Sequence, residues 1–245
     1  MTAIVGFAGH DYGLLAVDRN IIGRLSDGTQ RILTTTGGKL HEGPGGYFAG
    51  AGKARLLAAV AKRVAESTDP MSVAAAMRAE RKHRYEKARA GKHAARTPEP
   101  ERSFGVLLRE GKGPPEVWVL RPEDGYRPTK VAPGRPLVTG PEAEEMRPLI
   151  GVFRLLFVPT PGPDSLSRNL ELLNLYFWLR NRLKPLISAD YDLAVVTPEM
   201  AWMETHENAF GSDPERAEQI AAWLQDLGLS FRKLAKTIRL EVQDR

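Results

Sequence analysis

Two stretches decide the fold: Thr2-Ala3-Ile4-Val5-Gly6 and Gly13-Leu14-Leu15-Ala16-Val17-Asp18-Arg19. Each is a short apolar run, and Gly9-His10-Asp11 between them has the composition of a tight turn. Short apolar runs joined by a turn predict a β-hairpin, here with strands over residues 3–9 and 12–18. The chain is therefore expected to begin with antiparallel strands.

Further elements follow from the spacing of apolar residues and from turn signals such as Gly43-Pro44-Gly45-Gly46. Other strands are predicted over residues 31–36, 39–42, 47–50, 103–108, 116–120, 137–140, 151–159 and 191–196. Helices are predicted over residues 53–67, from Asp69 to about 96, from Pro141, from 164 to 186, and from Asp213 beyond 227. Strands joined by hairpins, with helices in separate blocks, favour an α+β sandwich over alternating βαβ units.

Composition excludes several classes of protein. The 245 residues include no cysteine, which excludes a disulfide scaffold, a thiolate zinc site, an iron–sulfur cluster and a cysteine nucleophile. The sequence shows no signal peptide and no apolar run long enough to span a bilayer, so a cytoplasmic protein without a membrane partner is expected. A net charge of +5 is weak support for nucleic-acid binding.

Neither the glycine-rich turn before residue 54 nor the set of histidines predicts a cofactor or metal site. Gly50-Ala51-Gly52-Lys53 lacks the phosphate-loop pattern, because Tyr47 stands where a glycine is required and Ala54 follows the lysine. The five histidines form no pair with metal-ligand spacing, so neither a metal nor a cofactor is expected.

The basic stretch Arg78–Arg96 has three interpretations: a solvated helix end, an interface within an oligomer, or a nucleic-acid stripe. The first is favoured, because aromatic residues for base stacking are nearly absent.

The residue after the initiator methionine can act as a nucleophile that carries its own base. Thr2 is small, so Met1 is expected to be removed, which would expose a threonine with a free α-amine. Such a residue provides both a nucleophilic hydroxyl and, in its amine, a base that titrates near pH 8.

The order of motifs in the first third of the chain resembles the proteasome β-subunit family of N-terminal-nucleophile (Ntn) hydrolases, which has bacterial members. The matching residues are Thr2–Gly6, Gly13–Arg19, Gly38-Lys39-Leu40, Tyr47–Gly52 and the helix from Lys53. The similarity is fainter at Phe104–Leu108, Glu116–Pro122 and Val138–Gly140. The resemblance implies one domain over residues 1–245, a four-layer αββα sandwich of two antiparallel sheets. Residues 151–187 and 228–245 would be additions to it.

The resemblance also implies an activity. Carried over by position, Thr2 would be the nucleophile of a threonine-type peptide or amide hydrolase, and Asp18 the carboxylate below it. Lys39 fits the place of the family's lysine, with Arg31 as the rival. Arg31 would be a poorer substitute, because a guanidinium does not share a proton with the amine.

The remaining implications concern the rest of the site and the assembly. Gly50 would supply a backbone N–H to an oxyanion hole, and Thr139 would replace a serine near the terminal amine. Family members form rings or spirals, so a homo-oligomer is expected, and whether an ATPase partner docks on it stays open. A catalytically inactive assembly or binding protein with the same sandwich is the alternative function.

Overall fold

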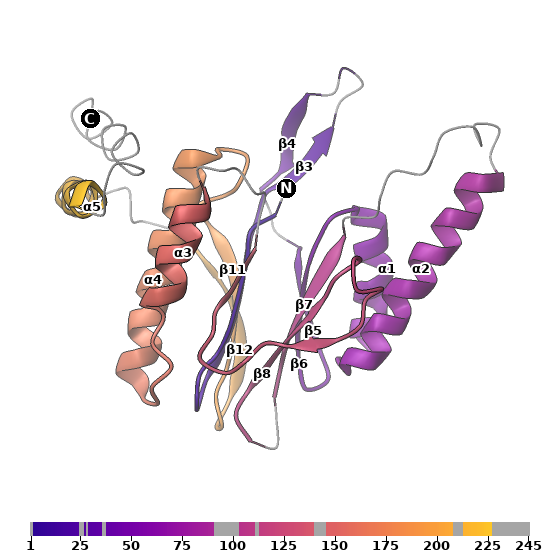
Figure 1. Ribbon diagram of the computed structural model, residues 1–245. Coiled ribbons are helices and arrows are strands. Elements are labelled where there is room, and N and C mark those ends of the chain that lie inside the picture. The colour runs from indigo at the N-terminus through magenta and orange to yellow at the C-terminus, as the bar shows by residue number, and fades with distance from the viewer. Residues whose placement is uncertain are drawn as a thin grey trace.

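The computed structural model of the chain describes residues 2–24, 27, 29–35, 38–90, 103–110, 113–139, 146–207 and 213–226. Within these ranges the chain forms two five-stranded antiparallel sheets with helices on their outer faces (Figure 1). The prediction of an α+β fold with antiparallel sheets is therefore confirmed, and the arrangement is compatible with a sandwich.

The first sheet contains the N-terminal hairpin. Its strands are, in spatial order, β10 (Leu137–Thr139), β1 (Ile4–Ala8), β2 (Gly13–Asp18), β11 (Tyr191–Val196) and β12 (Ala201–His206). β1, β2 and β11 are buried along their whole length, because helices cover one face of this sheet and the second sheet covers the other. Side chains alternate accordingly: Val5 and Phe7 enter the helix-side core, whereas Ile4 and Ala8 enter the core between the sheets.

The second sheet continues the chain and carries two helices on its outer face (Figure 1). Its strands are β5 (Leu40–Gly43), β6 (Gly46–Ala51), β7 (Phe104–Arg109), β8 (Glu116–Leu120) and β9 (Thr129–Lys130). The helices are α1 (Ala54–Val64) and α2 (Pro70–Ala90). Leu56, Val60 and Val64 form the apolar stripe of α1 and pack in one cluster with Phe48 and Leu107 of the sheet.

Three further helices follow: α3 (Met146–Leu156), α4 (Pro163–Leu183) and α5 (Pro214–Asp226), and all three contribute to the core against the first sheet. The strand predicted over 151–159 is wrong, because α3 occupies most of that range. A short, mostly apolar run of this kind suits a buried strand as well as a helix. In the helix Phe153 is buried while Leu155 is 86% exposed, so only one face packs. Among the described helices, none combines the length and apolarity needed to cross a bilayer.

A third, two-stranded sheet separates the N-terminal hairpin from β5. It consists of β3 (Ile21–Arg24) and β4 (Gln30–Thr34), and it stands out from the sandwich at the top of Figure 1. This hairpin takes up most of the chain between Arg19 and Lys39, so that Lys39 begins the approach to β5. The predicted helix start at Pro141, residues 91–96 of the basic stretch and the addition at 228–245 lie outside the described residues.

Candidate active site

A buried ion pair joins the end of β2 to the start of β5. The Nζ of Lys39 lies 3.0 Å from Oδ2 of Asp18 and donates a hydrogen bond to it. Asp18 is fully buried, and only 10% of the Lys39 side chain is exposed. The second carboxylate oxygen, Oδ1, accepts the backbone N–H of Ala3 at 2.8 Å. Both oxygens of Asp18 are therefore used, one by the lysine and one by the N-terminal strand.

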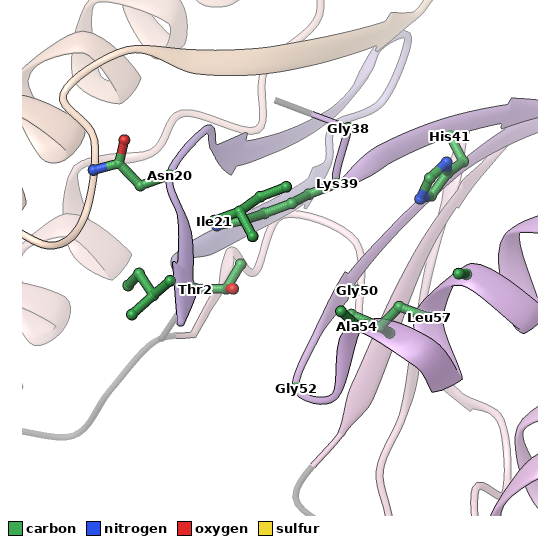
Figure 2. A pocket seen from close by; sticks show the side chains of 12 residues that line it. Thr2, Asn20, Ile21, Gly38, Lys39, His41, Gly50, Gly52, Ala54 and Leu57 are labelled. Carbon is green, nitrogen blue, oxygen red and sulfur yellow. The ribbon is translucent and has the colours of Figure 1, made fainter. Parts of the chain in front are cut away.

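The pairing of the N-terminal hairpin places Thr2 at this ion pair. In the β1–β2 register Ile4 lies opposite Val17, and one position further the N–H of Asp18 donates to the carbonyl of Ala3 at 3.1 Å. Thr2 precedes Ala3 and is 9% exposed. Figure 2 shows the side chains of Thr2 and Lys39 on the same side of a cavity. The predicted residues Thr2, Asp18 and Lys39, distant in sequence, therefore lie in one region.

Burial governs the protonation of the pair. Burial raises the pKa of Asp18, and the Lys39 ammonium, together with the Ala3 amide, opposes that rise. Burial lowers the pKa of Lys39, and the carboxylates of Asp18 and Asp192 oppose that fall. Each change favours the neutral form of its group, as expected when charges leave water. Lys39 is thus closer to losing its proton near neutral pH than an exposed lysine would be.

The cavity beside the pair has a volume of about 210 Å³. It is lined by Thr2, Asn20, Ile21, Ile22, Gly38, Lys39, His41, Gly50, Gly52, Ala54, Leu57 and Ala58. Aliphatic side chains come from β3 and α1, on opposite sides, and polar groups come from the N-terminal region and β5 (Figure 2). Burial lowers the pKa of His41, so its imidazole is largely neutral at pH 7. The cavity therefore combines apolar walls with a few polar groups, the usual composition of a small-molecule site.

Gly50 and Gly52 form the wall opposite Thr2, where β6 turns into α1 (Figure 2). β5 begins at Leu40, which pairs with Ala49, so the backbone at Gly50 extends beyond the β5 pairing. A Cβ on Gly50 would lie 2.4 Å from Cδ2 of Leu57, so a side chain here would displace Leu57 from the cavity wall. The predicted oxyanion residue Gly50 thus borders the same cavity as Thr2.

The two other predicted positions lie away from the cavity lining. Thr139 lies opposite Ile4 in the β10–β1 pairing, and its Oγ1 donates to the Ile4 carbonyl at 3.3 Å. Arg31 is exposed on β4, opposite Gly23. Of the two candidates for the lysine position, Lys39 and not Arg31 contacts Asp18.

Sequence analysis did not find a second buried carboxylate near Lys39. Asp192 on β11 is 8% exposed, accepts a hydrogen bond from Thr205 Oγ1 at 2.9 Å and lies 3.3 Å from Nε of Arg19. The run Tyr191–Val196 predicts a strand, but only the pairing of β11 with β2 shows that Asp192 adjoins the Asp18 end of that strand. No sequence signal distinguishes it from the other acidic residues.

A buried cation on α4 was also missed. Arg180 is fully buried, and its Nη1 donates to the phenol oxygen of Tyr176 at 2.5 Å. Burial raises the pKa of Tyr176 to about 12, so the phenol stays protonated and donates to the Thr139 carbonyl at 3.4 Å. Nε and Nη2 of Arg180 have no hydrogen-bond partner within the described ranges. Because the i, i+4 spacing of Tyr176 and Arg180 is common in any helix, it carries no signal for this contact.

The described residues contain no group of three or more His, Asp or Glu side chains placed to hold a metal ion. The groups that the structure brings together at the cavity are Thr2, the Asp18–Lys39 pair and the backbone at Gly50. Comparison of the chain with models of known protein families and with curated proteins found no match.

Proposed function

We propose that this protein is a threonine-type hydrolase of amide bonds, acting on peptides or small amides, with Thr2 as nucleophile after removal of Met1. The observation that carries the proposal is the buried Asp18–Lys39 pair, which adjoins Thr2 at the edge of a cavity. An ion pair removed from water costs free energy and is weak evidence of a purely stabilising role. Buried titratable groups beside a cavity are typical of catalytic sites.

In this proposal the α-amine of Thr2 is the general base, and Lys39 lowers the pKa of that amine. An amine that titrates near pH 8 loses its proton more readily beside an ammonium group, because like charges repel. The neutral amine then takes the proton of the Thr2 hydroxyl as its oxygen attacks the carbonyl carbon of the substrate. Positioned proton transfer of this kind contributes roughly 10²- to 10⁴-fold to a rate.

The Gly50 N–H would stabilise the negative charge that develops on the substrate oxygen during the attack. One such donor is worth roughly 10²- to 10³-fold in rate. Collapse of the tetrahedral intermediate breaks the C–N bond, the amine leaves with the proton, and Thr2 remains acylated. Water then hydrolyses the ester and regenerates the hydroxyl.

We also propose the four-layer fold of Ntn hydrolases and a homo-oligomeric assembly for this chain. The layer order of α1 and α2, the second sheet, the first sheet, and α3 and α4 agrees with the four-layer arrangement of Ntn hydrolases (Figure 1). A ring or spiral homo-oligomer stays a prediction, and light scattering on the purified protein would measure it.

The direct test is covalent labelling of Thr2. Intact-mass analysis first establishes that Met1 is absent, or a fusion cleaved immediately before Thr2 supplies that terminus. The protein is then incubated with a peptide epoxyketone or a β-lactone, which react with N-terminal threonines. We expect one adduct per chain, mapped to Thr2, and none in the variant Thr2→Ala. A protein with a free Thr2 that forms no adduct would instead fit the inactive assembly or binding protein.

The cavity adds a prediction about selectivity. Its walls are largely apolar, and burying an unpaired charge costs several kcal/mol, so probes with leucine at the cleavage position should label faster than probes with lysine. Ala54→Asp places a carboxylate in the wall at the first residue of α1, where a negative charge also suits the helix dipole. We expect the lysine-to-leucine ratio of labelling rates to rise at least about tenfold, or about 1.4 kcal/mol. The neutral isostere Ala54→Asn is the control, and an equal rise there would refute the charge-based explanation.

A further inference from the structure

Helix α2 changes character halfway along its length. Its first half packs against the second sheet through the buried side chains of Val73, Ala74 and Met77. In the range 78–87, all of which the structure describes, no side chain is buried. Figure 1 shows the helix leaning away from the sheet toward its C-terminal end. The second half of α2 is therefore accessible from solvent.

The accessible half of α2 carries mostly positive charge. Two sets of residues at i, i+3, i+4, i+7 spacing form adjacent stripes on it, and each stripe lines an open cavity together with one residue from outside α2. The first cavity has a volume of about 390 Å³ and is lined by Arg78, Arg81, Lys82, Tyr85 and Gly125. The second has a volume of about 410 Å³ and is lined by Arg55, Glu80, His83, Arg84 and Lys87. The basic face is defined as the six cations of these two linings: Arg55, Arg78, Arg81, Lys82, Arg84 and Lys87.

The carboxylates on this part of α2 neutralise only part of the charge. Oε1 of Glu80 lies 3.2 Å from Nε of Arg84, and Oε1 of Glu86 lies 3.9 Å from Nζ of Lys82. The second pair is solvated, since 79% of the Lys82 side chain is exposed, and such a pair contributes little. The six cations of the basic face therefore exceed the two carboxylates in the range 78–87.

Two of the arginines are held in place by the loop 121–127 and keep their charge. Nη1 of Arg78 donates to the carbonyl of Tyr126 at 3.4 Å, and Nη1 of Arg81 donates to the carbonyl of Pro122 at 3.1 Å. The loop itself contains as many arginines as carboxylates. These contacts fix two guanidinium groups beside the first cavity without neutralising them. Less side-chain entropy is then lost when the guanidinium groups bind an anion.

We propose that the basic face of α2 binds single-stranded nucleic acid. The helix from residue 78 to 87 is about 14 Å long, and its cations would follow a phosphate backbone over that length. Four of the six cations are arginines, whose planar guanidinium suits phosphate oxygens better than an ammonium does. Tyr85 belongs to the first stripe, and its side chain is 51% exposed, so an unstacked base can stack on its ring. Binding of this kind does not depend on the proposed hydrolase activity.

An acidic protein is the other partner that the charge would attract. The core of a protein–protein interface is depleted of charged residues and rich in apolar and aromatic ones. The basic face has the opposite composition, since Tyr85 is the one exposed large hydrophobic residue in the range 78–87. Sequence analysis favoured a solvated helix end because aromatic residues are few. The structure places this tyrosine on the same stripe as three of the cations, where a stacking residue is useful.

The test measures fluorescence anisotropy of a labelled strand of about 20 nucleotides, once as RNA and once as DNA, with the purified protein. We expect a dissociation constant of about 10 µM or lower at about 50 mM salt, and weaker binding as salt rises, because bound phosphates release counterions. One triple variant removes three exposed cations and leaves the contacts of the loop 121–127 in place: Arg55→Gln, Lys82→Gln and Lys87→Gln. It should weaken binding at least about tenfold and reduce the slope of log Kd against log salt by about 2.

The matched control is a second triple variant that removes the same charge from exposed positions on α3, α4 and α5, which pack against the other sheet: Arg154→Gln, Arg168→Gln and Arg216→Gln. All six substituted positions are exposed, so both triple variants should melt near the wild-type temperature. The control should bind within about twofold of the wild type. Equal weakening by the two triples would mean that net charge alone attracts the strand and would overturn the proposal, as would absence of binding at about 50 mM salt.

Tyr85→Ala tests stacking separately from charge. It should weaken binding about tenfold with the salt slope unchanged, because every cation remains, whereas Tyr85→Phe should bind like the wild type. Wild-type affinity of Tyr85→Ala would contradict recognition of unstacked bases. Polyglutamate is the competing ligand and should displace the strand poorly. Displacement by polyglutamate at an equal concentration of charge would assign the basic face to acidic polypeptides instead.

Discussion

Replacing Lys39 with methionine is expected to reduce the rate of Thr2 labelling by about 10³-fold or more, because it removes the ammonium that adjusts the Thr2 base. Methionine has nearly the length of the lysine stem and fills the same space. The substitution also leaves Asp18 buried without the cation 3.0 Å from its Oδ2. Removing one partner of a buried pair typically costs about 3–5 kcal/mol of folding stability. Labelling kinetics and chemical denaturation measure the two effects separately.

The double variant Asp18→Asn with Lys39→Met separates reactivity from folding. Asparagine keeps an oxygen for the Ala3 N–H, and neither charge of the Asp18–Lys39 pair remains. Replacing a buried ion pair by neutral groups is often close to neutral for stability. We therefore expect the double variant to recover most of the lost stability and none of the labelling. Wild-type labelling rates in the folded double variant would contradict the role given to the pair.

The part of the site that sequence predicted is the part built from local pairing. Asp18 and Ala3 face each other because one tight turn fixes the register of the N-terminal hairpin, and that turn is visible in the sequence. The position of Lys39 could not be assigned from local pairing, because the β3–β4 hairpin intervenes. Only the folded chain shows that Lys39, not Arg31, contacts the carboxylate of Asp18. The interpretation of Lys39 from sequence depended on the resemblance to a family with that residue order.

The missed features depend on contacts between elements remote in sequence. Asp192 lies beside the Asp18 end of β2 because β11, near the end of the chain, pairs with β2 near its start. Arg180 is buried because α4 packs against the first sheet. The residues next to it in the sequence do not predict that burial. The apolar run in α3 was misassigned for a related reason: hydrophobicity predicts burial, but in a short run it does not distinguish a strand from a helix. Register and packing against other elements decide these cases, and a single sequence contains neither.

A large loss of stability from one added methyl group is expected at Gly52, in the turn from β6 to α1. Its φ of +124° lies in a region that residues with a side chain rarely adopt. A Cβ there would lie 2.4 Å from the Cα of Ser103, a backbone atom that cannot rotate away. Backbone strain and overpacking each cost about 1–3 kcal/mol, so Gly52→Ala should lower the free energy of unfolding by about 3 kcal/mol or more.

Gly151→Ala is the control for Gly52→Ala, because it adds the same methyl group at a position with no atom within 4 Å of the new Cβ. Gly151 lies inside α3, where alanine is the better helix former by about 1 kcal/mol, so this variant should be slightly more stable than wild type. Urea denaturation would measure both changes. The turn at Gly52 also holds the cavity wall, since the N–H of Lys53 donates to Ser103 Oγ at 2.9 Å. Folded Gly52→Ala protein should therefore label more slowly at Thr2, and equal stability of the two alanine variants would show that the turn tolerates a side chain.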